Sequence, residues 1–266
     1  MILEWCLLLV LIGSGAGAVS SLIRCAPALI ALPSFYFFLP LFDVSFDEVM
    51  LPVIATCLVA FIPAHLHAWV RAMQKGRVDF QHMINFAPGF AMGGIIGAQL
   101  LSLINFVTFN VFFLLIAIIA ILLMTFILRS IQIAPRKINR IAYIPVGLGF
   151  GVISLLAGNC GRVMGQLLHI SSDNPEKNID GTILGFAIFT SIAAMVGFIY
   201  PAQPFDQFGL SGFVGAIHLP SLAVLAICYW FFHWFCYKRG NNLDRVVLYA
   251  SAIVFLMCSL VRMWVS

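Results

Sequence analysis

Hydrophobic residues run along this chain in blocks about as long as a membrane is thick. Between Phe80 and Leu128 there is no Asp, Glu, Lys or Arg. At 1.5 Å per residue, this run is roughly 70 Å of helix, about twice the hydrocarbon thickness of a bilayer. It must therefore cross twice, and we expect the turn near residues 102–105. Three further uncharged stretches each have room for one span: 181–205, 207–237 and 246–261.

These blocks predict helices, because the strict alternation of a membrane β-barrel is absent. With 62% hydrophobic and 9% charged residues, and a mean hydropathy of +1.07, the chain lies far from soluble domains, in which about a quarter of the residues are charged. Residues 1–19 resemble the apolar part of a signal peptide but carry Glu4 and no basic start, so we interpret them as the first membrane segment. The expected partners are the lipid bilayer and a small solute, and not nucleic acid.

Two apolar stretches are interrupted by glycines, polar residues and one arginine each. The first runs from Gly13 to Pro33 and contains Arg24, and the second runs from Gly147 to Gly165 and contains Arg162. Inside a bilayer, a charge is costly and irregular backbone is tolerated only where it is buried in protein or lines a cavity. The two breaks are therefore where we expect a functional site.

Counting each broken stretch as two segments gives five segments followed by five. The basic loops then all fall on one side, and they hold ten to eleven of the 14 Lys and Arg residues: 71–82, 129–140, 171–177 and 236–245. Loops rich in Lys and Arg stay in the cytoplasm. With an odd number of membrane segments in each half, the second half is inserted in the opposite orientation to the first, so the halves form an inverted repeat. The sequence predicts an all-α polytopic membrane protein of eight to ten segments, with repeats at 1–133 and 134–266. A full crossing and a re-entrant hairpin at each break have the same parity, so both stay open.

This distribution also predicts the orientation. Lys75 and Lys137 should be cytoplasmic and both termini outside, in a multi-pass protein of a bacterial inner membrane. The aromatic run 229–235 is expected to face lipid or another subunit, so a homo-oligomer is possible.

Several ordered motifs resemble one known family. Ala64-His65-Leu66-His67-Ala68-Trp69 precedes Gly76-Arg77-Val78-Asp79-Phe80, and Gly93-Gly94-Ile95-Ile96-Gly97-Ala98 follows; the plan repeats after residue 141. Over nearly the whole chain this resembles the TauE/SafE family of sulfite and organosulfonate exporters. The family's glycine cluster appears here as 24–27 and 158–161. The resemblance implies the family fold and the transport of a small anion.

Arg24 and Arg162 are the leading substrate-binding candidates. A guanidinium can bind sulfonate, sulfite or carboxylate oxygens with two donors at once. Neither arginine has an acidic residue nearby in its own segment, so the substrate could supply the counter-charge. Alternatively, Arg24 ends an apolar run and reaches the interface as an anchor.

The other candidates come from the same breaks. The backbone of Gly158, Asn159, Cys160 and Gly161 and the helix restart after it could offer N–H donors to an anion, although a simple packing kink is an alternative. Ser20 and Ser154 could line the path or bond within their helices. Asp180 is a candidate for coupling, or else a favourable charge at a helix start. His65 and His67 point to different helix faces and make a poor chelating pair.

We therefore expect a secondary transporter, an exporter of a small sulfur-containing or carboxylate anion, and not an enzyme. The segment from Gly13 to Gly17 lacks the Lys-Ser/Thr of a phosphate-binding loop, so ATP is not expected to drive transport. No cofactor is expected. The alternative is a metal or thiol-redox membrane protein using Cys25, Cys57, Cys160 and histidines. Their wide spacing without a CxxC pair favours the first interpretation, with no bound metal.

Overall fold

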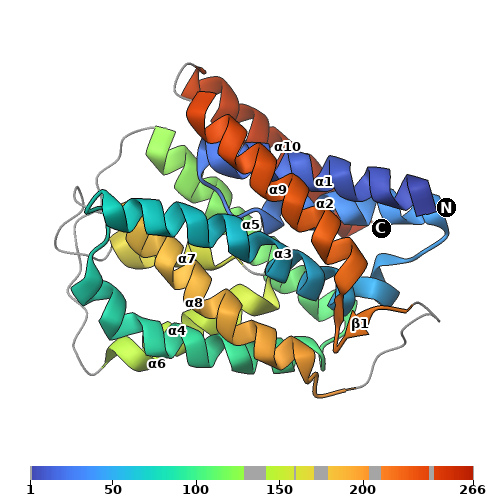
Figure 1. Cartoon of the computed structure of the whole chain (residues 1–266), viewed down its shortest axis with the longest axis horizontal. Coiled ribbons are helices and arrows are strands. Elements are labelled where there is room, and N and C mark those ends of the chain that lie inside the picture. The colour runs from blue at the N-terminus through green and yellow to red at the C-terminus, as the bar shows by residue number, and fades with distance from the viewer. Residues whose placement is uncertain are drawn as a thin grey trace.

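The computed structural model describes residues 2–128, 142–158, 160–170, 179–203, 211–239 and 243–265. In these residues the chain forms ten α-helices, a short 3-10 helix η1 and one two-stranded hairpin, β1 with β2 (Figure 1). The first five helices are α1 (Ile2–Ile23), α2 (Ala28–Phe38), α3 (Phe46–Gln74), α4 (Phe80–Leu101) and α5 (Phe106–Leu128), with η1 (Leu39–Phe42) after α2. The remaining elements are α6 (Tyr143–Leu156), α7 (Gly161–Ile170), α8 (Ile179–Ile199), β1 (Phe213–Val214), β2 (Ile217–His218), α9 (Leu219–Arg239) and α10 (Arg245–Val265).

Seven of the described helices are long and apolar enough to cross a membrane: α1, α3, α4, α5, α8, α9 and α10. The long uncharged run does supply two of them, since α4 ends at Leu101 and α5 begins at Phe106. The apolar segments 28–42 and 143–156 are shorter. The predicted all-α, polytopic membrane fold is confirmed.

The second broken stretch folds as a hairpin of two short helices. Gly89 of α4 packs against Gly147 of α6, and Gly97 packs against Leu155, so these two helices run in parallel. On the other side of the break, Gly161 of α7 packs against Ala187 of α8, so α7 runs back, antiparallel to α8.

Both ends of this hairpin lie at one end of the molecule. The α3–α4 connection is there, and Gly181 at the start of α8 packs against the Arg77 carbonyl. With 14 and 10 residues, α6 and α7 are roughly 21 and 15 Å long, too short for a bilayer core of about 30 Å. Of the two arrangements that the sequence leaves open at this break, the structure has the re-entrant hairpin.

The first half packs in a reciprocal way. Gly13 and Gly17 of α1 lie against α9: a Cβ on Gly13 would be 3.1 Å from the Cys228 Cβ, and one on Gly17 would be 2.6 Å from the Tyr229 carbonyl oxygen. In a repeat of five helices, α4 of the first half corresponds to α9 of the second half, and α1 corresponds to α6. The contact between α4 and α6 is therefore matched by the contact between α9 and α1, as an inverted repeat requires. The division at residues 133 and 134 stays a prediction.

The glycines of α4 make close contacts with two neighbouring helices. Gly93 packs against Gly151 of α6, and a Cβ on Gly94 would lie 2.5 Å from the Thr190 carbonyl oxygen of α8. A Cβ on Gly97 would lie 2.7 Å from the Leu155 Cβ. Small residues thus let the backbone of α4 come into contact with two neighbouring helices, as in other membrane helix bundles.

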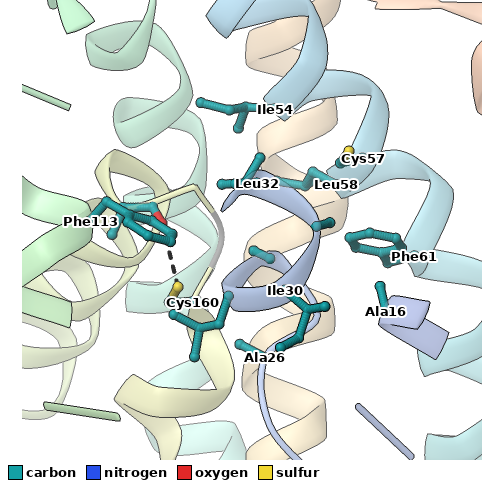
Figure 2. Packing of buried hydrophobic residues seen from close by; sticks show 14 of the residues in the cluster. Ala16, Ala26, Ile30, Leu32, Ile54, Cys57, Leu58, Phe61, Phe113 and Cys160 are labelled. Atoms are coloured by element: carbon teal, nitrogen blue, oxygen red, sulfur yellow. Dashed lines mark hydrogen bonds between the residues drawn. The ribbon is translucent and has the colours of Figure 1, made fainter. Parts of the chain in front are cut away.

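The two breaks meet in the middle of the bundle. Figure 2 shows Ala26 and Ile30, at the start of the α2 segment, close to Cys160, with Leu58 and Phe61 of α3 packed alongside. At the scale of the whole chain, both termini lie at one end of the molecule, and the end of α3 that precedes Lys75 lies at the other (Figure 1).

Candidate functional site

Arg162 is buried in the first turn of α7, with only 8% of its surface exposed. Its Nη1 donates hydrogen bonds to the carbonyl oxygens of Cys25, at 3.1 Å, and Ser20, at 3.4 Å. The Ser20 carbonyl belongs to the last turn of α1, where carbonyls lack partners within the helix and carry partial negative charge, and the Cys25 carbonyl lies in the break just after it. The Tyr249 hydroxyl donates to a third carbonyl there, that of Ile23, at 3.2 Å. Arg162 therefore joins the two broken stretches.

A cavity of about 80 Å³ opens beside Arg162, between the ends of α1, α3 and α9. A water molecule needs roughly 10–15 Å³ of such space, so the cavity has room for several waters or one small oxyanion. Five arginine and lysine side chains and two histidines line it: Arg24, Arg71, Lys75, Arg77, Arg162, His67 and His233. Among the described residues, no Asp or Glu is in the lining. We call this cavity the basic pocket.

Arg24 lies at the exposed rim of the basic pocket. Its backbone is left-handed, with φ of 54°, directly after the last residue of α1. A left-handed residue often ends a helix, but one with a side chain costs about 1–3 kcal/mol and is usually found where function requires it. The turn places the Arg24 side chain in the lining of the pocket.

Ser20 also lines the pocket, and its hydroxyl is already bonded. The Ser20 Oγ lies 2.9 Å from the hydroxyl of Tyr229 on α9. Tyr229 is fully buried and His233 is 7% exposed, whereas Trp230 and Phe231 are about half exposed. The expectation that the whole run 229–235 faces lipid or another subunit is therefore wrong for Tyr229 and His233, which are four residues apart and lie together on the buried face of α9.

The turn between α6 and α7, which contains Gly158 and Cys160 and ends at Gly161, is closely packed against its neighbours. Gly158, with φ of +73°, packs against Leu32 and Phe109, and Gly161 packs against Ala187 and Ser154. The Cys160 N–H donates to the Ser154 carbonyl at 3.0 Å, and the Cys160 thiol donates to the Ala157 carbonyl, the contact drawn in Figure 2.

Ser154 is buried, and its Oγ has no hydrogen-bond partner in the structure. Asn159 and the side chain of Asp180 lie outside the described residues, although Asp180 itself belongs to the first turn of α8. Of the candidates predicted from sequence, the structure brings Ser20, Arg24 and Arg162 together at the pocket.

The cysteines do not gather with histidines. Cys25, Cys57 and Cys160 are buried, free thiols. Within the described ranges, no group of three or more His, Cys, Asp or Glu residues is placed to hold a metal ion.

Sequence reasoning missed the pocket residues on α3. The span was expected to end near residue 70, before a surface loop, but α3 continues through Gln74. His67, Arg71 and Lys75 therefore follow one another at four-residue spacing, which places them on one side of the helix, and all three line the pocket. This spacing was the signal that could have found them.

A polytopic helical protein with a re-entrant hairpin and a cation-lined pocket at the junction of two broken stretches has the features of the membrane transporter class. The comparison with protein families agrees: the model of the sulfite exporter TauE/SafE family matches residues 9–263, and the chain belongs to that family. The protein is thus a multi-pass membrane protein of a family of exporters, which are transporters and not enzymes. No curated protein and no solved structure matches the chain.

Proposed function

We propose that the protein is a secondary transporter that exports a small oxyanion, and that the basic pocket binds this anion. Sulfite, an organosulfonate or another sulfur-containing or carboxylate anion fits the charge and size of the site. The observation that carries the proposal is the lining itself: five Arg and Lys side chains with no described acid among them. The positive charges of such a cluster repel one another, and an anion bound among them would reduce this repulsion.

Arg162 is the main anion-binding residue of this proposal. It is the buried cation of the pocket, whereas Arg24 and Lys75 are exposed, and charge-assisted bonds are stronger where water is excluded. A guanidinium has five N–H donors, more than the carbonyls of Ser20 and Cys25 use. Arg162 can therefore keep its hydrogen bonds to the Ser20 and Cys25 carbonyls while it binds an anion.

The orientation follows from the basic loops. With Lys75 in the cytoplasm and both termini outside, the pocket mouth faces the cytoplasm of a bacterial-type cell, as an exporter requires for loading. The interior-negative potential favours the exit of anions by roughly 2.3 kcal/mol per charge at 100 mV. Asp180, at the start of α8, stays a candidate for coupling.

Flux measurements in proteoliposomes test the proposal. Loss of one charge-assisted contact costs about 1.5 to 3 kcal/mol, so Arg162→Ala should lower sulfite or sulfonate affinity roughly ten- to 150-fold. Arg162→Lys keeps the charge without the planar fork and should lose less. Arg262→Ala is a matched control, because Arg262 packs over the Phe37 ring on α2 and does not line the pocket. A folded Arg162→Ala protein with wild-type flux would refute the assignment.

The metal or thiol-redox alternative has a separate test. If it were correct, protein purified without chelators would hold metal in stoichiometric amounts, and replacing Cys160 with Ser would remove it. Anion flux from metal-free protein would leave the transporter interpretation standing.

A further inference from the structure

A chain of buried polar side chains leads from the basic pocket into the core. The Ser20 Oγ lies 2.9 Å from the Tyr229 hydroxyl, which lies 3.1 Å from Nε2 of His65. The three residues come from α1, α9 and α3, and each is at most 3% exposed. Only Ser20 lines the pocket, so the chain joins the pocket to an otherwise enclosed imidazole.

Among the residues that the structure describes, the charged and titratable groups that interact with His65 are Tyr229 and His233 from α9 and Arg162 from α7. The described side chains of α2 and α8, which also pack against α3, include no Asp, Glu, Lys, Arg or His. His218 of β2 bonds to α3 at Thr56, nine residues and roughly 14 Å along the helix from His65.

An ionisable side chain enclosed in a membrane protein is costly and is generally retained for function. Here the hydrogen bonds allow both protonation states of His65. When His65 is neutral, Ser20 donates to Tyr229, and Tyr229 donates to Nε2. When His65 is protonated, both bonds reverse, and Ser20 can donate to the Gly17 carbonyl, which lies 3.4 Å away.

We propose that His65 is a proton-binding site linked to the anion in the basic pocket, with Ser20 and Tyr229 as the path between them. Water in the pocket gives a proton to the Ser20 oxygen, Ser20 passes its own proton to Tyr229, and Tyr229 passes its own to Nε2. Each hydroxyl ends with one proton, the solvent has lost one, and His65 has become an imidazolium. The inference rests on the proposed function of the pocket.

Electrostatics makes the two binding events favour each other. Without an anion, an imidazolium at His65 adds a positive charge beside Arg162 and His233. An anion in the pocket offsets that repulsion. Because linkage is reciprocal, anion binding should draw a proton to His65, and a proton on His65 should tighten anion binding.

Methanesulfonate is the probe, because it stays ionised near neutral pH and any proton taken up must bind the protein. A pH indicator in weakly buffered detergent solution should report up to one proton taken up per anion bound. Methanesulfonate affinity should be about tenfold tighter at pH 5.5 than at pH 7.5, within the usual range of coupling between sites. In His65→Gln, the anion should still bind, and proton uptake and pH dependence should fall to the part that His67 and His233 of the pocket lining contribute.

Two further variants keep the test decisive. Tyr229→Phe retains the ring that packs 4.4 Å from Phe61 but breaks the path, so proton uptake should be at least tenfold slower in stopped-flow mixing. His218→Gln, in β2 and outside the pocket lining, should behave as wild type. Uptake that is undiminished in His65→Gln would overturn the assignment to His65, and an unchanged rate in Tyr229→Phe would overturn the path.

The experiment distinguishes a failure of the proton coupling from a failure of the proposed function. Methanesulfonate binding to the wild type without proton uptake would refute only the coupling. No binding to the wild type would refute the proposed function, and the inference with it.

Discussion

The Arg162 side chain has two roles. It bonds to the carbonyls of Ser20, in the last turn of α1, and of Cys25, in the break after it, and it presents a positive charge to the basic pocket. A buried guanidinium without either role would be expensive. The exposed Arg24 at the rim has the same charge but meets water, which screens it.

We predict different effects for these two arginines. Arg24→Ala should weaken anion binding less than Arg162→Ala, and its effect should disappear at high ionic strength, because exposed charges act through screened, longer-range attraction. Binding isotherms at low and high salt measure both effects. Equal losses that do not change with salt would show that Arg24 contacts the anion directly.

His218 predicts a pH effect on stability at the opposite end of the molecule. It lies at the end of β2, outside the spans, and its imidazole Nδ1 is 2.7 Å from the Ser221 hydroxyl. Partial burial lowers the pKa of His218 below its ordinary value near 6.5. The folded state therefore binds fewer protons than the unfolded state, so this contribution to stability is present above about pH 6.5 and declines as the pH falls through the folded pKa.

The check is a thermal melt of the wild type and of His218→Gln between pH 7.5 and 5.5. The melting temperature of the wild type should fall with pH, and the variant should lose a small part of that slope because His218 is one partly buried histidine among six in the chain. A slope that becomes steeper in the variant would contradict the assignment.

At the scale of helices, glycine decides how closely α4, α6 and α8 approach. Gly93 and Gly94 of α4 meet α6 and α8 on different sides at backbone distance. The same device joins α1 to α9 through Gly17. The α1–α9 contact holds together two of the helices that line the pocket.

The matching prediction compares two glycines. A Cβ on Gly94 would lie 2.5 Å from the Thr190 carbonyl oxygen, whereas one on Gly149 of α6 would meet nothing within 4 Å. Gly94→Ala should therefore cost about 1–3 kcal/mol through overpacking, and Gly149→Ala should be neutral or stabilising because alanine favours helix. Melting temperatures in detergent measure both. A Gly94→Ala protein as stable as Gly149→Ala would show that α8 does not approach so closely.

The helices were predictable from sequence, because runs of apolar residues such as 80–128 determine where a chain can cross a bilayer. Arg162 and Arg24 were predictable as candidates because each is isolated in apolar sequence. The pocket was not, since it forms from α1, α3, α7 and α9, and no local pattern brings His233 or Lys75 to Arg162. The Ser20–Tyr229 bond joins residues 209 positions apart, which only the tertiary fold determines.

At the scale of the whole molecule, the termini lie at one end and the basic pocket opens toward the other. We predict that Lys75→Cys, in a background without the exposed Cys258, reacts with a membrane-impermeant maleimide only from the cytoplasmic side. A cysteine at position 206, which lies outside the described residues, should react from the other side. Labelling of both from the same side would end the model of two inverted five-segment halves.

The central claim is that the transported anion binds in the basic pocket, and the position of a bound anion tests it most directly. An experimental structure with saturating sulfite or methanesulfonate should show the anion within hydrogen-bonding distance of the Arg162 guanidinium, beside Ser20 and open toward Arg24 and Lys75. Density for the anion at another place in the bundle, with the basic pocket holding only water, would contradict the account.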